Sequence, residues 1–202
     1  MVLKAFYAFL FALCAYLGFQ VYDLYSARQS LTNIPEQYTI GSEDYDLTVV
    51  KFMNYSCIYC QQAHPIIMEA ITLDANVRLA PRPLLSSDPD GSAAAIIFYA
   101  AANQGKAAQA HNYLMQNGQN LTRERLTEIA EALELDVDQF VSDIDSKDTH
   151  NKAIANMRAL ARLGGTGVPT FFIGPNIMYM AQERMPTAQD FLNIFEEARA
   201  SR

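Results

Sequence analysis

Two cysteines separated by two residues are the strongest chemical signal in this sequence. Cys57 and Cys60 follow Leu47–Met53, an apolar stretch rich in β-branched residues that predicts a buried strand, and they open a helical stretch to about Leu73. At a first helical turn, Cys57 would face unpaired backbone N–H groups and the positive end of the helix dipole, and both favour its thiolate. Cys60 would lie one turn later, close enough to form a disulfide. We therefore predict that Cys57 is the exposed nucleophile and Cys60 the covered resolving thiol.

The same pair could instead bind a metal. A lone C-x-x-C can be half of a zinc site, but only His64 is close to it in sequence, and we predict no metal. Soft thiolates could also hold copper, with thioethers supplied by Met178, Met180 and Met185, so a copper-handling module is the alternative function. A non-catalytic peptide-binding adaptor is a third hypothesis. The other candidate zinc ligands are His111, His150 and Cys14.

Two prolines add to the cysteine signal. Pro65 lies five residues after Cys60, inside the predicted helix, where proline is normally costly. Pro169 lies in Gly167-Val168-Pro169-Thr170, at the start of an apolar strand. A proline at that place needs a shaped turn, which a cis Val168–Pro169 bond would provide.

These features together resemble the DsbA-like thiol-disulfide oxidoreductases of bacterial envelopes. The resemblance lies in three segments, F-M-N-Y-S-C-I-Y-C-Q-Q-A-H-P, P-R-P-L and G-T-G-V-P-T-F-F-I-G, and extends from about Pro35 to Arg199. It implies a thioredoxin fold with a helical insertion, a redox-active Cys57–Cys60 disulfide and no cofactor. It also implies that Pro169 is a cis-proline packed against the cysteines.

Three further residues are predicted to support the site. Val168, before the proline, resembles the oxidase-type residue whose backbone pairs with an extended substrate segment. Tyr59 stands where strong oxidases often have histidine, so a less oxidising couple is expected. Lys51 replaces the buried acid that usually lies six residues before the first cysteine. Its cation could stabilise a thiolate if it points inward, or it could extend to solvent.

The element order predicts an α/β fold with a helical insertion. Strands are expected at 37–40, 47–53, 76–80, 170–173 and 177–180, with a block of helices from Ser92 to Leu163 and a last helix capped by Thr187. A polar connector is expected from Asp23 to Pro35. The predicted units are a membrane anchor at 1–22, a linker at 23–34, a thioredoxin-like core at 35–86 and 148–202, and an all-helical insertion at 87–147.

The N-terminal segment predicts a membrane helix. Ala5–Tyr22 is eighteen residues without a charge, about 27 Å as a helix, which matches the hydrocarbon core. It lacks a convincing cleavage site, so an uncleaved single anchor is favoured over a signal peptide. Lys4 would stay in the cytoplasm, which places the rest of the chain outside it.

The charge balance narrows the partners. Fifteen Lys and Arg against 22 Asp and Glu give a net charge of −7, which argues against a nucleic-acid-binding protein. The acidic excess lies between Glu124 and Asp148 and predicts a solvated helical face.

Taken together, the N-terminal segment and the family resemblance predict a single-pass protein of the bacterial inner membrane with its catalytic domain in the periplasm, an oxidase rather than a reductase. Its partners would be cysteine-containing exported proteins and a membrane redox protein, DsbB-like for an oxidase or an electron donor for a reductase.

Overall fold

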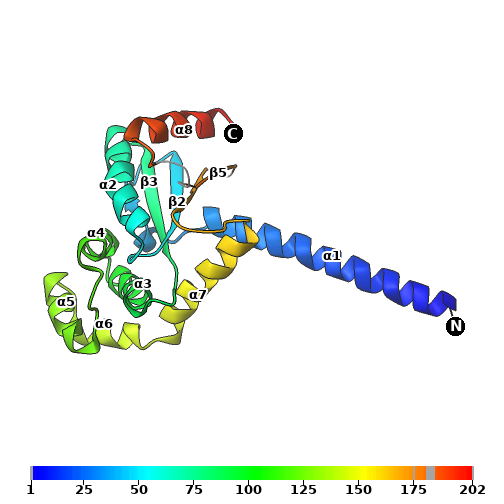
Figure 1. The fold of residues 1–202 in the computed structure, drawn as a ribbon, viewed down its shortest axis with the longest axis horizontal. Coiled ribbons are helices and arrows are strands. Elements are labelled where there is room, and N and C mark those ends of the chain that lie inside the picture. The colour runs from blue at the N-terminus through cyan, green and yellow to red at the C-terminus, as the bar shows by residue number, and fades with distance from the viewer. Residues whose placement is uncertain (1, 175, 181–184, 202) are drawn as a thin grey trace.

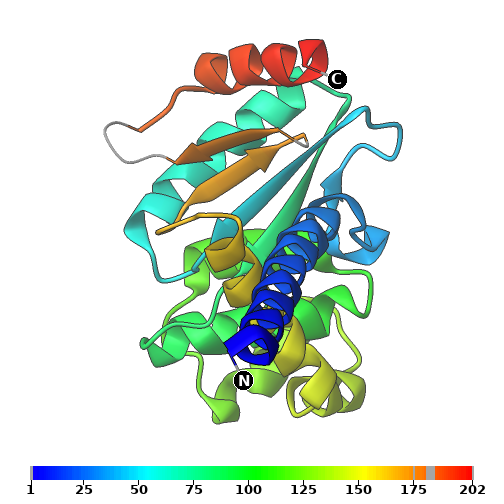
Figure 2. The ribbon, with the colours of Figure 1, turned by 90° about the vertical axis from the view of Figure 1, so that its right-hand side faces the viewer.

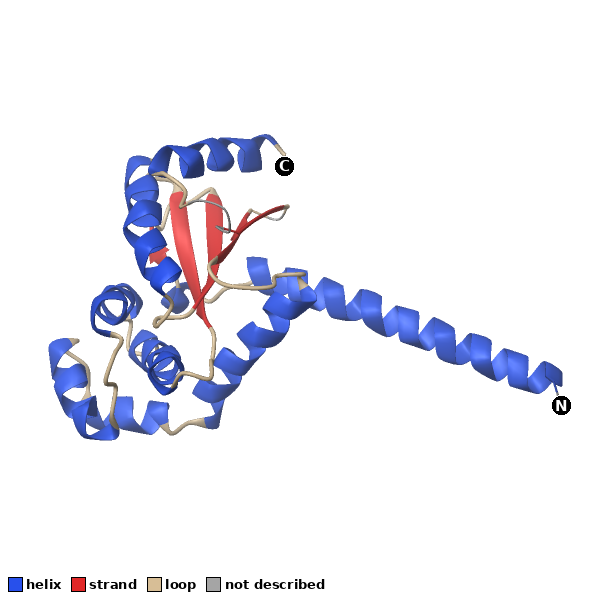
Figure 3. Ribbon diagram, viewed as in Figure 1, coloured by secondary structure: helices blue, strands red, loops and turns tan. Residues whose placement is uncertain are grey.

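A five-stranded sheet forms the centre of the molecule (Figure 3). The computed structural model describes residues 2–174, 176–180 and 185–201. Strand order is β1-β3-β2-β4-β5, with β2 and β3 parallel and the other neighbours antiparallel. The strands are β1 (Ile40–Gly41), β2 (Leu47–Met53), β3 (Val77–Pro83), β4 (Thr170–Ile173) and β5 (Ile177–Met180).

Helices cover both faces of this sheet (Figures 1 and 2). Helices α2 and α8 pack against each other on one side, and α7 with the last turns of α1 lies on the other. The helices are α1 (Val2–Thr32), α2 (Ile58–Leu73), α3 (Pro89–Ala102), α4 (Ala107–Asn117), α5 (Leu126–Ala132), α6 (Val137–Ile144), α7 (Lys147–Arg162) and α8 (Ala188–Ala200), with 3-10 turns η1 (Glu36–Tyr38) and η2 (Arg123–Arg125).

Burial in the core explains why the central strands could be predicted from the sequence. Strand β2 is buried along nearly its whole length because it pairs with β3 on one side and β4 on the other. Phe171 of β4 packs edge-on against Phe191 of α8, with ring centroids 5.0 Å apart. A capping box of Thr187 and Asp190 begins α8, as its sequence predicted. The predicted strands 47–53, 170–173 and 177–180 are confirmed at the same residues.

Two sequence predictions were wrong near the N-terminus. The expected polar connector from Asp23 to Pro35 is helical up to Thr32, because α1 continues beyond its apolar part. Its last turns bury Ala27 and Leu31, and Asp23 forms an ion pair with Arg162 of α7 at 2.6 Å. The strand expected at 37–40 is mostly the 3-10 turn η1, followed by the two-residue strand β1.

Strand β3 extends three residues beyond the end of the strand predicted at 76–80. Pro81 and Pro83 lie inside β3, opposite Lys51 and Met53 of β2. Proline has no backbone N–H to donate to a neighbouring strand. Strand β1 pairs only with Arg78 and Leu79, so it makes no hydrogen bonds with the part of β3 that contains the two prolines.

Candidate active site

A tight turn joins β2 to α2 and holds the two cysteines. Asn54 organises it: the side-chain oxygen accepts from the Ser56 backbone N–H at 2.8 Å, and the side-chain nitrogen donates to the Leu84 carbonyl at 3.2 Å. The Cys57 backbone N–H donates to the Asn54 carbonyl at 3.2 Å. Cys57 is then the N-cap residue of α2, as the sequence predicted.

The two thiols have unlike surroundings. Both thiols are free in this structure, with Cys57 half-buried and Cys60 fully buried. A hydrogen bond from Cys60, with help from backbone N–H groups, lowers the pKa of Cys57 to about 6 although partial burial opposes it. That same hydrogen bond and burial raise the pKa of Cys60. Ile58 and Tyr59, between them, are more than half exposed.

The turn that contains Pro169 reaches Cys57. The Val168–Pro169 peptide bond is cis, and the Cys57 sulfur lies 3.8 Å from the Val168 carbonyl oxygen. Pro169 is buried and Val168 is half-exposed beside the thiol. The Thr170 hydroxyl donates to the Gly167 carbonyl at 2.6 Å and braces the turn. The fold therefore brings together residues more than 100 positions apart, as the resemblance implied.

Lys51 points inward beneath the dithiol. Its side chain is 0% exposed, and its Nζ donates to the Cys60 carbonyl at 3.2 Å. Nζ also lies 5.9 Å from the ring centroid of Phe171, its partner on β4. Burial lowers the pKa of Lys51 to about 8, although the two cysteine sulfurs act in the opposite direction. Of the two orientations left open by the sequence, the solvent-facing one is wrong.

Sequence reasoning missed an aromatic and histidine layer behind the cysteines. Tyr55 and His111 are fully buried, with the Tyr55 hydroxyl 3.0 Å from His111 Nδ1. The rings of His64 and His111 stand edge to face at 4.8 Å. The position of His111 on the buried face of α4, beside Ala110 and Leu114, was the available signal. His64 is half-buried, and its Nε2 lies 3.1 Å from Asn112 Oδ1.

The comparisons with known proteins agree with this geometry. The family model for the DSBA-like thioredoxin domain matches residues 88–193, a segment that contains Val168 and Pro169 and begins after the two cysteines. The chain belongs to the DSBA-like thioredoxin family. The predicted thioredoxin-like fold with an inserted helical region is thereby confirmed.

Solved structures extend the match over most of the chain. A thioredoxin-like oxidoreductase from Silicibacter pomeroyi is 26% identical, with a TM-score of 0.75 over 86% of this chain and 98% of that one. The catalytic domain of Proteus mirabilis ScsC (22%, TM-score 0.69, 88% and 97% covered) and Wolbachia pipientis α-DsbA1 (17%, 0.70, 87% and 96%) share the fold.

Curated relatives are much longer proteins. The chain is 30% identical over 135 residues to "Na(+)/H(+) antiporter NhaA 3" of Salinispora tropica, and 31% over 134 residues to an NhaA antiporter of Herminiimonas arsenicoxydans. The match covers 66% of this chain and 21% of each relative. The chain thus corresponds to about a fifth of these proteins.

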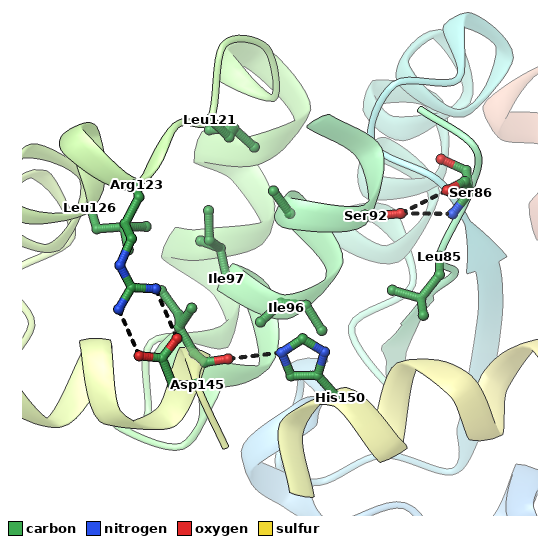
Figure 4. Close-up of a pocket in the computed structure, with 12 residues that line it drawn as sticks. Leu85, Ser86, Ser92, Ile96, Ile97, Leu121, Arg123, Leu126, Asp145 and His150 are labelled. Carbon is green, nitrogen blue, oxygen red and sulfur yellow. Dashed lines mark hydrogen bonds and ion pairs between the residues drawn. The ribbon is translucent and has the colours of Figure 1, made fainter. Parts of the chain in front are cut away.

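A separate cavity lies in the helical part of this DSBA-like domain (Figure 4). It measures about 520 Å³ and has an apolar floor from α3, which includes Ile96 and Ile97. Polar groups at its rim already have partners: Arg123 forms a two-point ion pair with Asp145, and His150 Nε2 lies 3.0 Å from the Ile144 carbonyl. Neither cysteine lines it, so the dithiol and this cavity are distinct.

The methionines of the copper hypothesis have other neighbours. Met178 lines a small pocket with Leu24 and Leu31 of α1, and the Met180 sulfur lies 3.9 Å from the Thr166 hydroxyl. Met185 packs against the core. Within the described part of the chain, no three His, Cys, Asp or Glu side chains are grouped so that they could hold a metal ion.

Proposed function

We propose that this protein exchanges disulfides with cysteines of exported proteins, with Cys57 as nucleophile and Cys60 as resolving thiol. The observation that carries the proposal is the contrast between the two thiols. Cys57 is accessible, caps α2 and has a pKa lowered to about 6, whereas Cys60 is buried and has a raised pKa. Only Cys57 is then a ready thiolate at neutral pH.

The oxidising direction begins with the Cys57–Cys60 disulfide. A substrate thiolate attacks the Cys57 sulfur, the disulfide breaks, and Cys60 leaves and takes up one proton. A second substrate thiolate then attacks the substrate sulfur of the mixed disulfide and releases Cys57 as a thiolate. Two electrons pass from substrate to enzyme, and the low pKa of Cys57 makes it a good leaving group.

The same acidity supports an oxidase rather than a reductase. A stabilised thiolate favours the dithiol over the disulfide, and a couple whose reduced form is stable is oxidising. Tyr59 offers no cation to that thiolate, so we expect the reduction potential of this couple to be lower than that of the strongest oxidases of this kind. An oxidase would return its electrons to a quinone-linked membrane protein of the DsbB type.

Substrate recognition would use the proline turn. Val168 is half-exposed, and its carbonyl lies beside the Cys57 sulfur. A substrate segment that passes in extended form can add its backbone hydrogen bonds there, with its cysteine at Cys57. Pro169 is positioned to keep the turn against the dithiol.

The location follows from α1. Within the described residues, Lys4–Thr32 is the one helix long and apolar enough to cross a membrane. We propose that residues 5–22 are an uncleaved inner-membrane anchor and that the catalytic domain lies in the periplasm. The contacts of Ala27, Leu31 and Asp23 with the domain support an anchor, because a cleaved signal needs none of them.

A reporter protein fused after Arg202 should be active outside the cytoplasm and sediment with membranes. Recovery in the soluble periplasmic fraction would show a cleaved signal.

Trapping tests the ordered roles of the cysteines. In cells, Cys60→Ala should accumulate mixed disulfides with exported proteins because no resolving thiol remains. Cys57→Ala is the matched control and should trap far fewer. Equal trapping by the two variants would reject the assignment. The reduction potential of the full chain in detergent, measured by titration with glutathione, then decides the direction of the reaction. An oxidase should have a potential of about −120 mV and a reductase one of about −270 mV.

A further inference from the structure

The amine of Lys51 is buried, and the charge that balances its protonated form is the Cys57 thiolate of the dithiol. The groups that interact with it come from three elements: Cys57, Cys60 and His64 at α2, His111 on α4 and Phe171 on β4. Tyr55, in the turn, contacts His111. Its amine donates to the Cys60 carbonyl at 3.2 Å, and the charge that favours its protonated form is the Cys57 thiolate, since Cys60 keeps its proton.

That balance depends on the redox state. In the dithiol form, the Cys57 thiolate lies opposite the Lys51 ammonium and offsets the cost of its burial. In the disulfide form neither sulfur can carry a charge. An ammonium would then remain alone among buried apolar and neutral groups, where the free amine is favoured.

We propose that Lys51 is a redox-linked protonation site, an amine when Cys57 and Cys60 form a disulfide and an ammonium when they are a dithiol. The inference rests on the proposed function, because it concerns the same thiol pair. Lys51 would act on the reaction through its charge, as a positioning residue. The usual acid at this place would do the reverse, since an anion there opposes the thiolate.

The proton balance can be written with glutathione as the reductant. Two glutathione thiols lose two electrons and two protons and form one glutathione disulfide. The protein disulfide breaks, Cys57 becomes a thiolate, Cys60 takes up one proton and Lys51 takes up the other. When Lys51 changes completely from amine to ammonium, no net proton is released. Without Lys51, one proton would be released for each disulfide reduced.

Neighbouring groups do not obscure this exchange between pH 7 and 8. Burial lowers the pKa of His64 to about 4 and lowers that of His111 well below its usual value, so both histidines stay neutral. Tyr55 and Cys60 keep their protons because burial raises the pKa of each, helped at Cys60 by the bond with Cys57. Cys57, with a pKa of about 6, is already ionised. Lys51, with a pKa of about 8 in the dithiol form, is the member of this cluster that titrates.

The direct test is an NMR titration of the full chain in detergent micelles, with lysine labelled at the ε-carbon. Loss of one signal in Lys51→Met assigns the residue. We expect its acid dissociation constant to be about tenfold larger in the disulfide form than in the dithiol form. Equal constants in the two forms would overturn the proposal. Because chemically oxidised protein serves here, the result does not depend on whether the protein exchanges disulfides with substrates.

The equilibrium with glutathione gives a second measurement. For the wild-type protein, reduction should become only about threefold more favourable between pH 7 and 8, because Lys51 takes up about half a proton in this range. For Lys51→Met, reduction should become about five- to tenfold more favourable over the same unit, since nearly one proton is released. Lys106→Met removes a lysine that pairs with Glu134 far from the dithiol and should behave as wild type. An equal change in all three proteins would exclude the linkage, whereas failure of all three to react with glutathione would instead contradict the proposed function.

Discussion

Cys57 owes its proposed reactivity to the hydrogen bond from Cys60 and to the backbone N–H groups at the N-terminus of α2, and these predict how its labelling depends on pH. Alkylation follows the thiolate, and the pKa of Cys57 is lowered to about 6, so labelling should be half-maximal near pH 6 and complete above pH 7. Cys60 should stay unlabelled in the native protein because it is buried with a raised pKa. Mass spectrometry after a short pulse of iodoacetamide measures both. Equal labelling of the two cysteines would refute the assignment.

The sign of the linked stability follows from that shift. A thiol whose folded pKa is depressed stabilises the fold above its unfolded pKa of about 8.5, and the contribution disappears as pH falls through about 6. The reduced protein should therefore lose stability relative to the disulfide form between pH 8.5 and about 6.

Lys51 stabilises the same thiolate in our proposal, and its substitution by a neutral or an acidic residue tests this effect. Lys51→Met should raise the Cys57 pKa and make the couple more reducing, and Lys51→Glu should do so more strongly because an anion repels the thiolate. Each unit of pKa is worth about 1.4 kcal/mol, or about 30 mV in this two-electron couple. Thiolate absorbance titrations of the three proteins measure the effect. Superimposable curves would mean that Lys51 exerts no field at Cys57.

The site was partly predictable at this scale. Cys57, Cys60 and Pro169 could be found because their spacing and neighbours are local in sequence. The direction of Lys51 could not, because strand alternation gives two faces but does not say which one α2 covers. His111 was hidden for a similar reason: it reaches the site from α4, an element whose position depends on the whole helical block.

At the scale of elements, the start of α3 supports the active-site turn. A Cβ built on Gly91 would lie 2.6 Å and 2.7 Å from the side-chain atoms of Asn54 and 2.9 Å from the Ser86 hydroxyl. Asn54 is buried and its amide holds the turn through two hydrogen bonds, so it cannot move aside without losing them.

Gly91→Ala should therefore destabilise the protein by about 1–2 kcal/mol, even though alanine is the better helix former by about 1 kcal/mol. Gly167→Ala is the control, since a Cβ there meets no atom within 4 Å and should change stability by less than about 0.5 kcal/mol. Urea denaturation of the reduced proteins provides the comparison. A Gly91→Ala protein as stable as wild type would show that α3 does not restrain Asn54.

Element boundaries were predictable where local pattern and tertiary environment agree. Strand β2 is apolar on both faces and is buried on both, so its limits were readable. The end of α1 was not, because the segment after Tyr22 is polar in composition but buries one narrow stripe through Ala27 and Leu31. Such a stripe is visible only when its partner, α7, is known.

For the whole molecule, the consequence is a continuous helix from the proposed membrane segment to the DSBA-like domain (Figure 1). Leu31 is 5% exposed on that stripe, and Arg82 of β3 donates to the Ser30 carbonyl near the end of the helix. The ion pair of Asp23 with Arg162 closes the other end of the contact. In our proposal the dithiol is therefore held at one orientation above the membrane, without a flexible tether.

Leu31→Asp tests this attachment, because a buried carboxylate without a partner should release the last turns of α1 from α7. Release exposes the backbone around Arg28, so limited trypsin digestion in micelles should cut there at least about tenfold faster than in wild type. Tyr25→Asp is the matched control: it adds the same charge on the solvent face, where Tyr25 is 60% exposed, and should leave the cleavage rate nearly unchanged. Glutathione equilibria of both variants should match wild type, since the dithiol lies on other elements. Rapid cleavage of the wild-type protein at Arg28 would show that the domain is flexibly tethered, and the fixed orientation would have to be abandoned.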